Sequence, residues 1–214
     1  IALLLVGAAP EGEPTKSEME KNPDGWVDLL PASDPDLKNW FRVGIPPKSP
    51  IKEPTPWKLD VKTGVLFCDG VGYHDMLLHK EEQGDFVYHV EWRFLPVTSG
   101  PKGYNAGIYV RNSADGAIWH QAQTGGGPIG YLFGETPVDG KVKRVQLNKD
   151  VKAKPVKPAG EWNVFEVTCK GDTISLWANG HVVNEWRGIA VPKGFLGLES
   201  EGYKVEFKNV KIKK

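Results

Sequence analysis

The sequence has few of the residues that hold small disulfide-rich or zinc-bound proteins together. It contains two cysteines in 214 residues, too few for a disulfide framework or a cysteine-based zinc site. Cys68 and Cys169 could still form one bridge, but sequence spacing does not show whether their Cα atoms come within bridging distance. Cys169 shares the strand parity of apolar neighbours, which favours a small buried residue.

The chain also lacks net charge and segments of helical period. Lysine plus arginine and aspartate plus glutamate both number 27, so no overall field favours nucleic acid or an anionic membrane. We therefore expect a neutral ligand and no nucleic-acid partner. The 25 glycines and eight tryptophans favour many turns and aromatic-bearing strands.

No apolar run is long enough to span a bilayer. The first ten residues, IALLLVGAAP, are apolar and end in small residues, which is typical of the remainder of a secretory signal. We predict a residual signal peptide at residues 1–9, a flexible segment at 10–23 and an exported protein, periplasmic or extracellular. A buried first strand is less favoured because residues 11–23 are polar and rich in Glu, Lys and Pro.

Residues 85–123 carry the strongest strand pattern. Between Phe86 and Phe94 apolar residues alternate with His89, Glu91 and Arg93, which is the period of a strand with one buried face. Many short strands with turn signals, including the Asn179-Gly180 hairpin, predict an all-β antiparallel sandwich forming a single domain over residues 24–214.

The glycine-rich and basic segments do not indicate a cofactor site. The sequence GGGPIG at residues 125–130 satisfies the dinucleotide-binding glycine pattern, but it contains Pro128 and no amphipathic helix follows, so we predict a loop between strands. The lysine-rich residues 140–160 are expected to be a solvated excursion. No nucleophile elbow, zinc-protease, P-loop or calcium-loop motif occurs.

Polar residues on the strand faces define the candidate site. His89 shares a face with Glu91 and Arg93, and could act as a general base beside a cationic stabiliser. The alternative is an exposed Glu91–Arg93 ion pair worth at most about 1 kcal/mol. On the next strand, Tyr109 and Arg111 alternate with core residues. Aromatic, amide and guanidinium groups on one sheet face favour a carbohydrate ligand.

The ordered segments DFVYHVEWRF, NAGIYVR, PAGEWN, WANG and GLESEGYKVEFKNVKIK resemble the 3-keto-disaccharide hydrolase domain family (DUF1080) from about Gly25 to Lys213. The resemblance implies a concanavalin A-like jelly-roll sandwich. It also implies cleavage of glycosides whose sugar is oxidised at C3: a base removes the C2 proton, the aglycone leaves by elimination, and water then adds. This route requires no redox cofactor in the chain.

The resemblance also assigns positions. Glu91, Arg93, Asn105, Gly107 and Arg111 match the family pattern, with Ala106 in place of serine, and Glu201 matches its S-E-G. Two further departures matter: Gln121 stands where the family usually has glutamate, and Glu199 stands where it usually has glutamine. Because an amide is neither a base nor an anionic ligand, we hypothesise that Glu199 restores the carboxylate that Gln121 lacks.

We predict two groups of site residues, one for acid/base chemistry and one for substrate binding. Four of these residues, Arg93, Arg111, His120 and Glu199, are expected to converge in one concave pocket. The predicted acid/base residues are Glu199, His120 and His89. The predicted substrate-binding residues are Glu91, Arg93, Asn105, Tyr109, Arg111, Trp119, Gln121 and Gln123. A divalent metal is compatible with the carboxylates, although no motif indicates one. The alternatives are a non-catalytic carbohydrate-binding module and, less favoured, a surface interaction domain.

Overall fold

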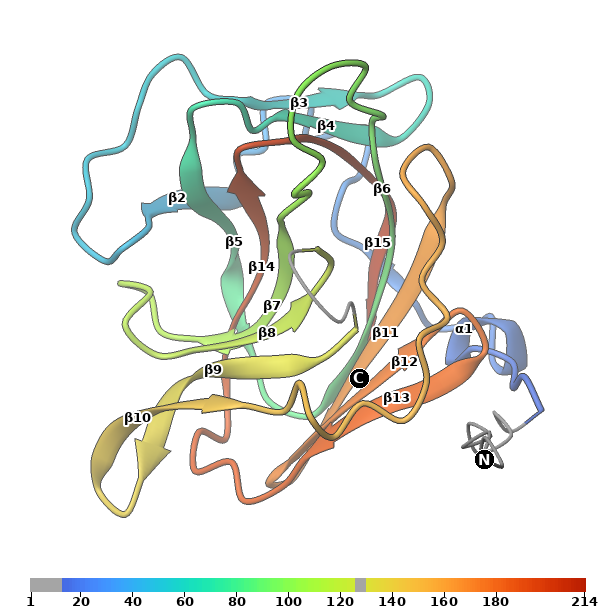
Figure 1. Cartoon of the computed structure of the whole chain (residues 1–214), viewed down its shortest axis with the longest axis vertical. Coiled ribbons are helices and arrows are strands. Elements are labelled where there is room, and N and C mark those ends of the chain that lie inside the picture. Colours follow the sequence, from blue (N-terminus) through green and yellow to red (C-terminus); the bar gives the residue numbers. More distant parts are fainter. Residues whose placement is uncertain (1–12, 126–129) are drawn as a thin grey trace, which may run out of the picture.

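The computed structural model describes residues 13–125 and 130–214. The residual signal peptide predicted at 1–9 and residues 126–129 of the glycine-rich loop lie outside the described residues. The described chain forms one short helix and fifteen strands (Figure 1). Their bounds are α1 Glu18–Lys21, β1 Val27–Asp28, β2 Trp40–Gly44, β3 Trp57–Asp60, β4 Val65–Asp69, β5 His74–Gln83, β6 Phe86–Phe94, β7 Gly107–Asn112, β8 Trp119–Gln123, β9 Leu132–Val138, β10 Lys141–Gln146, β11 Asn163–Lys170, β12 Thr173–Ala178, β13 His181–Trp186, β14 Gly194–Glu201 and β15 Lys204–Lys213.

The strands form two antiparallel sheets around one core, so the predicted all-β jelly-roll sandwich is confirmed. Sheet A has the order β13-β12-β11-β6-β15-β4-β3, with β1 paired to β15, and sheet B has the order β10-β9-β8-β7-β14-β5-β2. In Figure 1, β14 lies between β5 and β7, and β15 lies beside β6. The last two strands therefore supply a central strand to each sheet.

The alternation predicted for residues 86–94 is present in β6. Phe86, Tyr88, Val90, Trp92 and Phe94 are all buried in the core. However, β6 belongs to sheet A, whereas β7 and β8 belong to sheet B. Because each sheet turns one face to the core, the polar faces of β6 and β8 point to opposite sides of the molecule.

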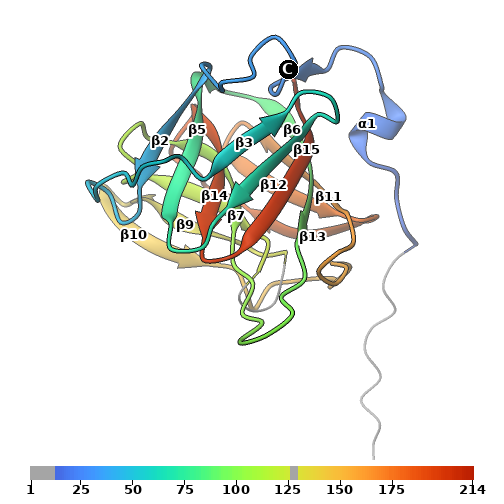
Figure 2. The ribbon, with the colours of Figure 1, turned by 90° about the horizontal axis from the view of Figure 1, so that it is seen from above.

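Residues 13–22, here called the N-terminal strap, cover the part of the outer face of sheet A formed by β11 and β12. Figure 2 shows α1 on the opposite side of the molecule from β2 and β10. Ser17 caps α1 through a capping box with Glu20, and the amide of Thr15 donates to the carbonyl of Gly180 at 2.7 Å. Within the segment predicted at 10–23, residues 18–21 are helical and Thr15 is hydrogen-bonded to the sheet.

The structure also bears on the predictions for the two cysteines, the Asn179-Gly180 hairpin and residues 140–160. Cys68 and Cys169 are both free and buried, and burial raises the pKa of each thiol to about 12. Asn179 and Gly180 have φ values of 42° and 105° in the β12–β13 hairpin. Residues 140–160 are not wholly a solvated excursion, because β10 pairs with β9 and carries Arg144 onto sheet B. No described helix has the length and apolar composition needed to cross a membrane.

Candidate functional site

A groove of about 380 Å³ lies on the face of sheet B that turns away from sheet A. Its floor comes from β8, β7, β14 and β5, and its lining combines carboxylates, amides, an imidazole and aromatic rings. The lining residues are Ile45, Pro46, Pro47, His74, Met76, Asn105, Tyr109, Gly116, Trp119, Gln121, Gln123, Tyr131, Phe133, Glu135, Arg144, Glu199 and Glu201.

Glu199 occupies the groove floor because of strand alternation in β14. Leu196 and Leu198 point into the core, so Glu199 points to the opposite face, where it is 3% exposed. Its carboxylate accepts hydrogen bonds from the Tyr109 hydroxyl at 2.6 Å and from Gln121 Nε2 at 2.7 Å. These two hydrogen bonds hold the carboxylate in one position in the floor of the groove.

The protonation state of Tyr109 and the absence of a side chain at Gly107 preserve these two hydrogen bonds. Burial, and next the adjacent Glu199 charge, raise the pKa of Tyr109 well above its ordinary value, so Tyr109 remains a protonated donor. A Cβ atom at Gly107 would fall 1.8 Å from Gln121 Nε2, so only glycine lets the Gln121 side chain lie across β7. The glycine of the NAGIYVR segment is therefore needed for the geometry of the groove.

A chain of amides extends from this centre to a second carboxylate. Gln123 Nε2 donates to Asn105 Oδ1 at 3.1 Å, and Asn105 Nδ2 donates to Glu201. Burial, followed by the negative charge of Glu199, raises the pKa of Glu201. The groove thus contains two neighbouring carboxylates with different environments.

His74 lies between these carboxylates, although the sequence analysis had not assigned it to the site. Its Nε2 is 3.8 Å from Glu199 Oε1 and 3.7 Å from Glu201 Oε2. The interaction with Glu199 raises the pKa of His74, while burial acts in the opposite direction. The sequence signal was available: His74 has the same strand parity as Met76, which also lines the groove.

Aromatic rings form one wall of the groove. The ring of Trp119 packs edge-to-face on Tyr109 and Phe133. The Arg144 guanidinium lies over Trp119 at 5.3 Å and pairs with Glu135 at 3.4 Å. Flat apolar surface next to hydrogen-bonding groups suits a sugar ring, which has apolar faces and a polar edge.

The same centre has a donor set that suits a divalent cation. One donor atom from each of His74, Glu199 and Glu201 lies within 4.8 Å of the others. Imidazole and carboxylate are common ligands of zinc and of other first-row metals. These three residues are the ones that could hold a metal among the described residues.

The expected convergence of Arg93, Arg111, His120 and Glu199 is wrong, because only Glu199 reaches the groove. His120 follows Trp119 in β8, so it points into the core, where its Nε2 lies 3.0 Å from Thr136 Oγ1. Burial lowers the pKa of His120 to about 4. His120 is therefore a neutral core residue on the opposite side of β8 from Gln121.

Arg111 also lies outside the groove. Its φ of 50° interrupts the alternation of β7, and its side chain is 0% exposed. The guanidinium donates to the carbonyls of Gly84, Gly171 and Val191 and pairs with Asp85 at 3.0 Å. These contacts tie loops together at one end of the sandwich, which is a structural arrangement.

His89, Glu91 and Arg93 lie on the outer face of sheet A. His89 Nδ1 is 2.9 Å from Glu166, and Arg93 pairs with Glu206 at 2.7 Å. Glu91 contacts Lys208 and Asn209; its pKa is lowered to about 2, first by His89. Strand parity was predicted correctly, but it cannot show to which sheet a strand belongs.

Six of the predicted site residues do meet in the groove. They are Glu199, Asn105, Tyr109, Trp119, Gln121 and Gln123. His74, Glu201, Glu135 and Arg144 join them, and only Glu201 had been marked by the family pattern. The hypothesis that Glu199 faces Gln121 agrees with their direct hydrogen bond.

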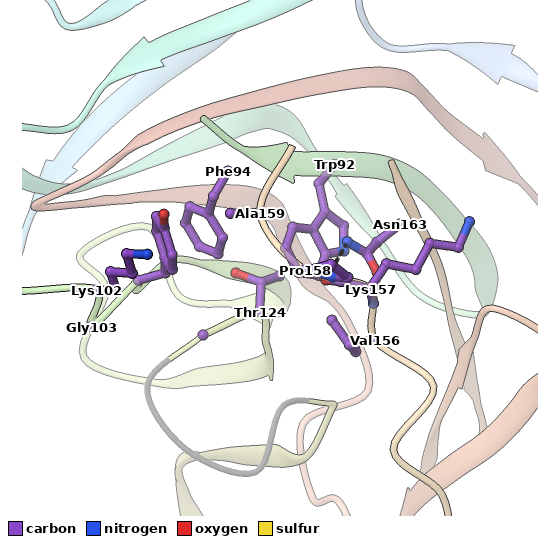
Figure 3. A pocket seen from close by; sticks show the side chains of 12 residues that line it. Trp92, Phe94, Lys102, Gly103, Thr124, Val156, Lys157, Pro158, Ala159 and Asn163 are labelled. Carbon is purple, nitrogen blue, oxygen red and sulfur yellow. Dashed lines mark hydrogen bonds between the residues drawn. The ribbon is translucent and has the colours of Figure 1, made fainter. Parts of the chain in front are cut away.

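A larger cavity of about 610 Å³ is lined by residues of β6, β11 and the adjoining loops (Figure 3). Its walls include Phe94 and Tyr104, whose rings stack at 5.1 Å. No carboxylate or imidazole occurs among its described lining residues, so it offers no side chain for acid/base chemistry near neutral pH. The groove on sheet B is therefore the better candidate site.

The chain is therefore a jelly-roll sandwich, and sheet B carries a groove that is lined by polar groups and has an aromatic wall. Residues 20–213 match the model of the 3-keto-alpha-glucoside-1,2-lyase-like domain, and the chain belongs to this family. Comparison with curated proteins found no match.

Solved structures with the same fold include carbohydrate-active proteins. A candidate glycosyl hydrolase from Parabacteroides distasonis ATCC 8503 is 20% identical, with a TM-score of 0.61, covering 94% of this chain and 99% of its own. The carbohydrate-binding module CBM66 from Bacillus subtilis is 14% identical, with a TM-score of 0.59, covering 82% and 96%. LamAcat from Zobellia galactanivorans is 12% identical, with a TM-score of 0.55, covering 82% and 90%. At these identities the similarity establishes the fold.

Proposed function

We propose that the protein cleaves 3-keto-glycosides by elimination in the groove of sheet B, with Glu199 as the base. The observation that carries the proposal is the buried Glu199 carboxylate, held by Tyr109 and Gln121 at 2.6 and 2.7 Å in a sugar-sized groove. Family membership supports this substrate class. Acidity at C2 comes from the neighbouring ketone, so one carboxylate suffices as the base.

The proposed reaction balances without a redox partner. Glu199 takes the C2 proton, the electrons of that bond form the C1–C2 double bond, and the C1–O bond breaks with its electron pair on the aglycone oxygen. His74, with its raised pKa, delivers a proton to that oxygen. Water then adds across the double bond, with hydroxyl at C1 and a proton at C2.

Negative charge develops on the ketone oxygen when the C2 proton leaves. Gln123 and Asn105 have amide groups in the groove, and amide N–H groups stabilise such an oxyanion. Trp119 would support the sugar or aglycone ring. The donor atoms of His74, Glu199 and Glu201 also fit a divalent ion, which would polarise the ketone as a Lewis acid. With the ion bound, Glu199 and His74 would be ligands instead of base and proton donor, so the reaction written above applies to the metal-free groove.

A non-catalytic carbohydrate-binding module is the second candidate function. Gln121 stands in place of the family glutamate, so the carboxylate of the pattern implied by the resemblance lies at another position of the groove, Glu199. The aromatic wall and the amides would bind sugar without turnover. Binding of a 3-keto-glucoside without aglycone release would favour this function.

The test is aglycone release from a chromogenic 3-keto-glucoside by the full chain and by Glu199→Gln. Loss of a positioned base should lower kcat about 10²–10⁴-fold. Glu206→Gln, the same chemical change on the outer face of sheet A, is the matched control and should retain activity. Full activity of Glu199→Gln would eliminate Glu199 as the base.

A further inference from the structure

A second cavity, of about 460 Å³, lies between the N-terminal strap and the outer face of sheet A. Met19 and Glu20 of the strap line one side, and His89, Glu91 and Trp177 of the sheet line the other. It lies on the opposite side of the sandwich from the groove, and the proposed reaction uses none of its residues.

The roof of this cavity is tied to its floor by direct hydrogen bonds. Trp177 Nε1 donates to Thr15 Oγ1 at 2.8 Å. The amide of Met19, at the start of α1, donates to Glu166 Oε1 at 3.0 Å. These contacts join the strap to β12 and β11, so the cavity exists only while the strap is docked.

His89 presents an unsatisfied nitrogen in this region. The residue is 4% exposed, and its Nδ1 lies 2.9 Å from the Glu166 carboxylate. Because a carboxylate only accepts hydrogen bonds, Nδ1 carries the proton. The buried Nε2 has no hydrogen-bond partner among the described residues, and Glu91 Oε1 is 3.9 Å away, too far for a hydrogen bond. A buried unpaired group of this kind indicates a missing partner.

The remaining walls indicate what that partner is. The indole of Trp177 and the side chain of Val164 are apolar, whereas Glu20 and Glu91 offer acceptors and Lys157 offers donors. Acids and a base together leave no strong field for a charged ligand. An apolar wall beside mixed donors and acceptors suits a molecule with many hydroxyl groups.

We propose that this cavity is a second carbohydrate site, roofed by the N-terminal strap, in which a sugar hydroxyl pairs with His89 Nε2. The site is independent of the proposed reaction: it requires neither Glu199 nor a 3-keto group. Binding there would stabilise the docked strap, because both sides of the cavity contact the ligand.

The experiment titrates the ¹⁵N-labelled full chain with methyl α-D-glucopyranoside and follows the Trp177 indole N–H signal. We expect saturable shifts with a dissociation constant below about 10 mM, equally in wild type and in Glu199→Gln. Val164→Trp, which fills the cavity, should weaken the binding at least tenfold. Amide hydrogen exchange of residues 15–20 in wild type should slow when the sugar is added.

Two outcomes would overturn the proposal. One is saturation at the Trp177 signal that Val164→Trp leaves unchanged. The other is no saturable shift and unchanged strap exchange in wild type, which would mean that water alone fills the cavity. The exchange measurement requires no variant, so the proposal remains testable even if Val164→Trp fails to fold. Loss of catalysis in Glu199→Gln has no bearing on either result.

Discussion

Replacing Gln121 with glutamate would place a second carboxylate against Glu199 in the floor of the groove. The present contact, from Gln121 Nε2 to Glu199 Oε2, is 2.7 Å. Two charges at that separation repel by about 6 kcal/mol at an effective dielectric constant of about 20. Such a pair avoids this cost by sharing one proton, as adjacent carboxylates in other proteins do.

The shared proton would change the pH dependence of the reaction. A base must be deprotonated to act, so raising its pKa moves the acidic limb of kcat/KM upward. Solvent and relaxation reduce the repulsion, and we expect a displacement of about 2 pH units. The assay is aglycone release from a 3-keto-glucoside between pH 4 and 9, with Gln121→Met as the uncharged control.

Stability gives a second readout that does not require activity. A carboxyl group whose pKa is raised in the folded state is destabilising at pH values above its unfolded pKa. The melting temperature of Gln121→Glu should therefore fall, relative to wild type, much more at pH 8 than at pH 4. An unchanged acidic limb with full activity, together with equal melting temperatures at pH 8, would refute the proposed role of Glu199.

Three further predictions concern the same centre. Tyr109→Phe removes the donor at 2.6 Å from Glu199; urea unfolding should show a loss of about 1.5–3 kcal/mol, and a loss near zero would contradict this contact. His74→Asn should abolish the basic limb of the pH profile. Because the pKa of His74 is raised, its stabilising effect is complete below pH 6.5 and disappears as pH rises through the raised value, so the variant should lose more stability at pH 5.5 than at pH 9. Manganese at about 100 times its dissociation constant should stabilise the wild-type protein by about 2.7 kcal/mol, and equal stabilisation of His74→Ala would exclude this donor set.

The sequence predicted which residues of β6 share a strand face, but not which sheet each strand joins. The alternation in β6 was predicted correctly residue by residue, because side-chain parity is local. Its pairing with β11 and β15 depends on segments about 70 to 125 residues away. The sequence pattern therefore predicted that the polar faces of β6 and β8 lie together. In the structure these strands belong to different sheets, and the core lies between them.

At position 120, the sequence also did not show which side of β8 faces the groove. His120 and Gln121 are adjacent, and only one of them can face the groove. Histidine is a common catalytic residue, so His120 was predicted to belong to the site. Its neighbours Trp119, Gln121 and Gln123 line the groove. Because side chains alternate along β8, His120 points to the other side and packs against Trp186 in the interior.

The helix in the N-terminal strap could have been predicted from a local sequence pattern, although the polar composition of the segment favoured disorder. Its polar residues favoured flexibility, yet Ser17 and Glu20 form the S-x-x-E pattern that begins a helix. What could not be predicted is the partner of that helix. Glu166 lies nearly 150 residues later and accepts hydrogen bonds from Met19 and Glu18.

The central positions of β14 and β15 also affect how the chain can fold during synthesis. Until residues 194–213 have been made, β5 and β7 lack the strand that joins them, and β4 and β6 lack theirs. Both sheets therefore remain in two parts, with open edges, until these residues have been made. Such edges pair readily with other chains, and contacts between distant segments form slowly. We expect the nascent chain to depend on protection from aggregation until both strands have left the ribosome.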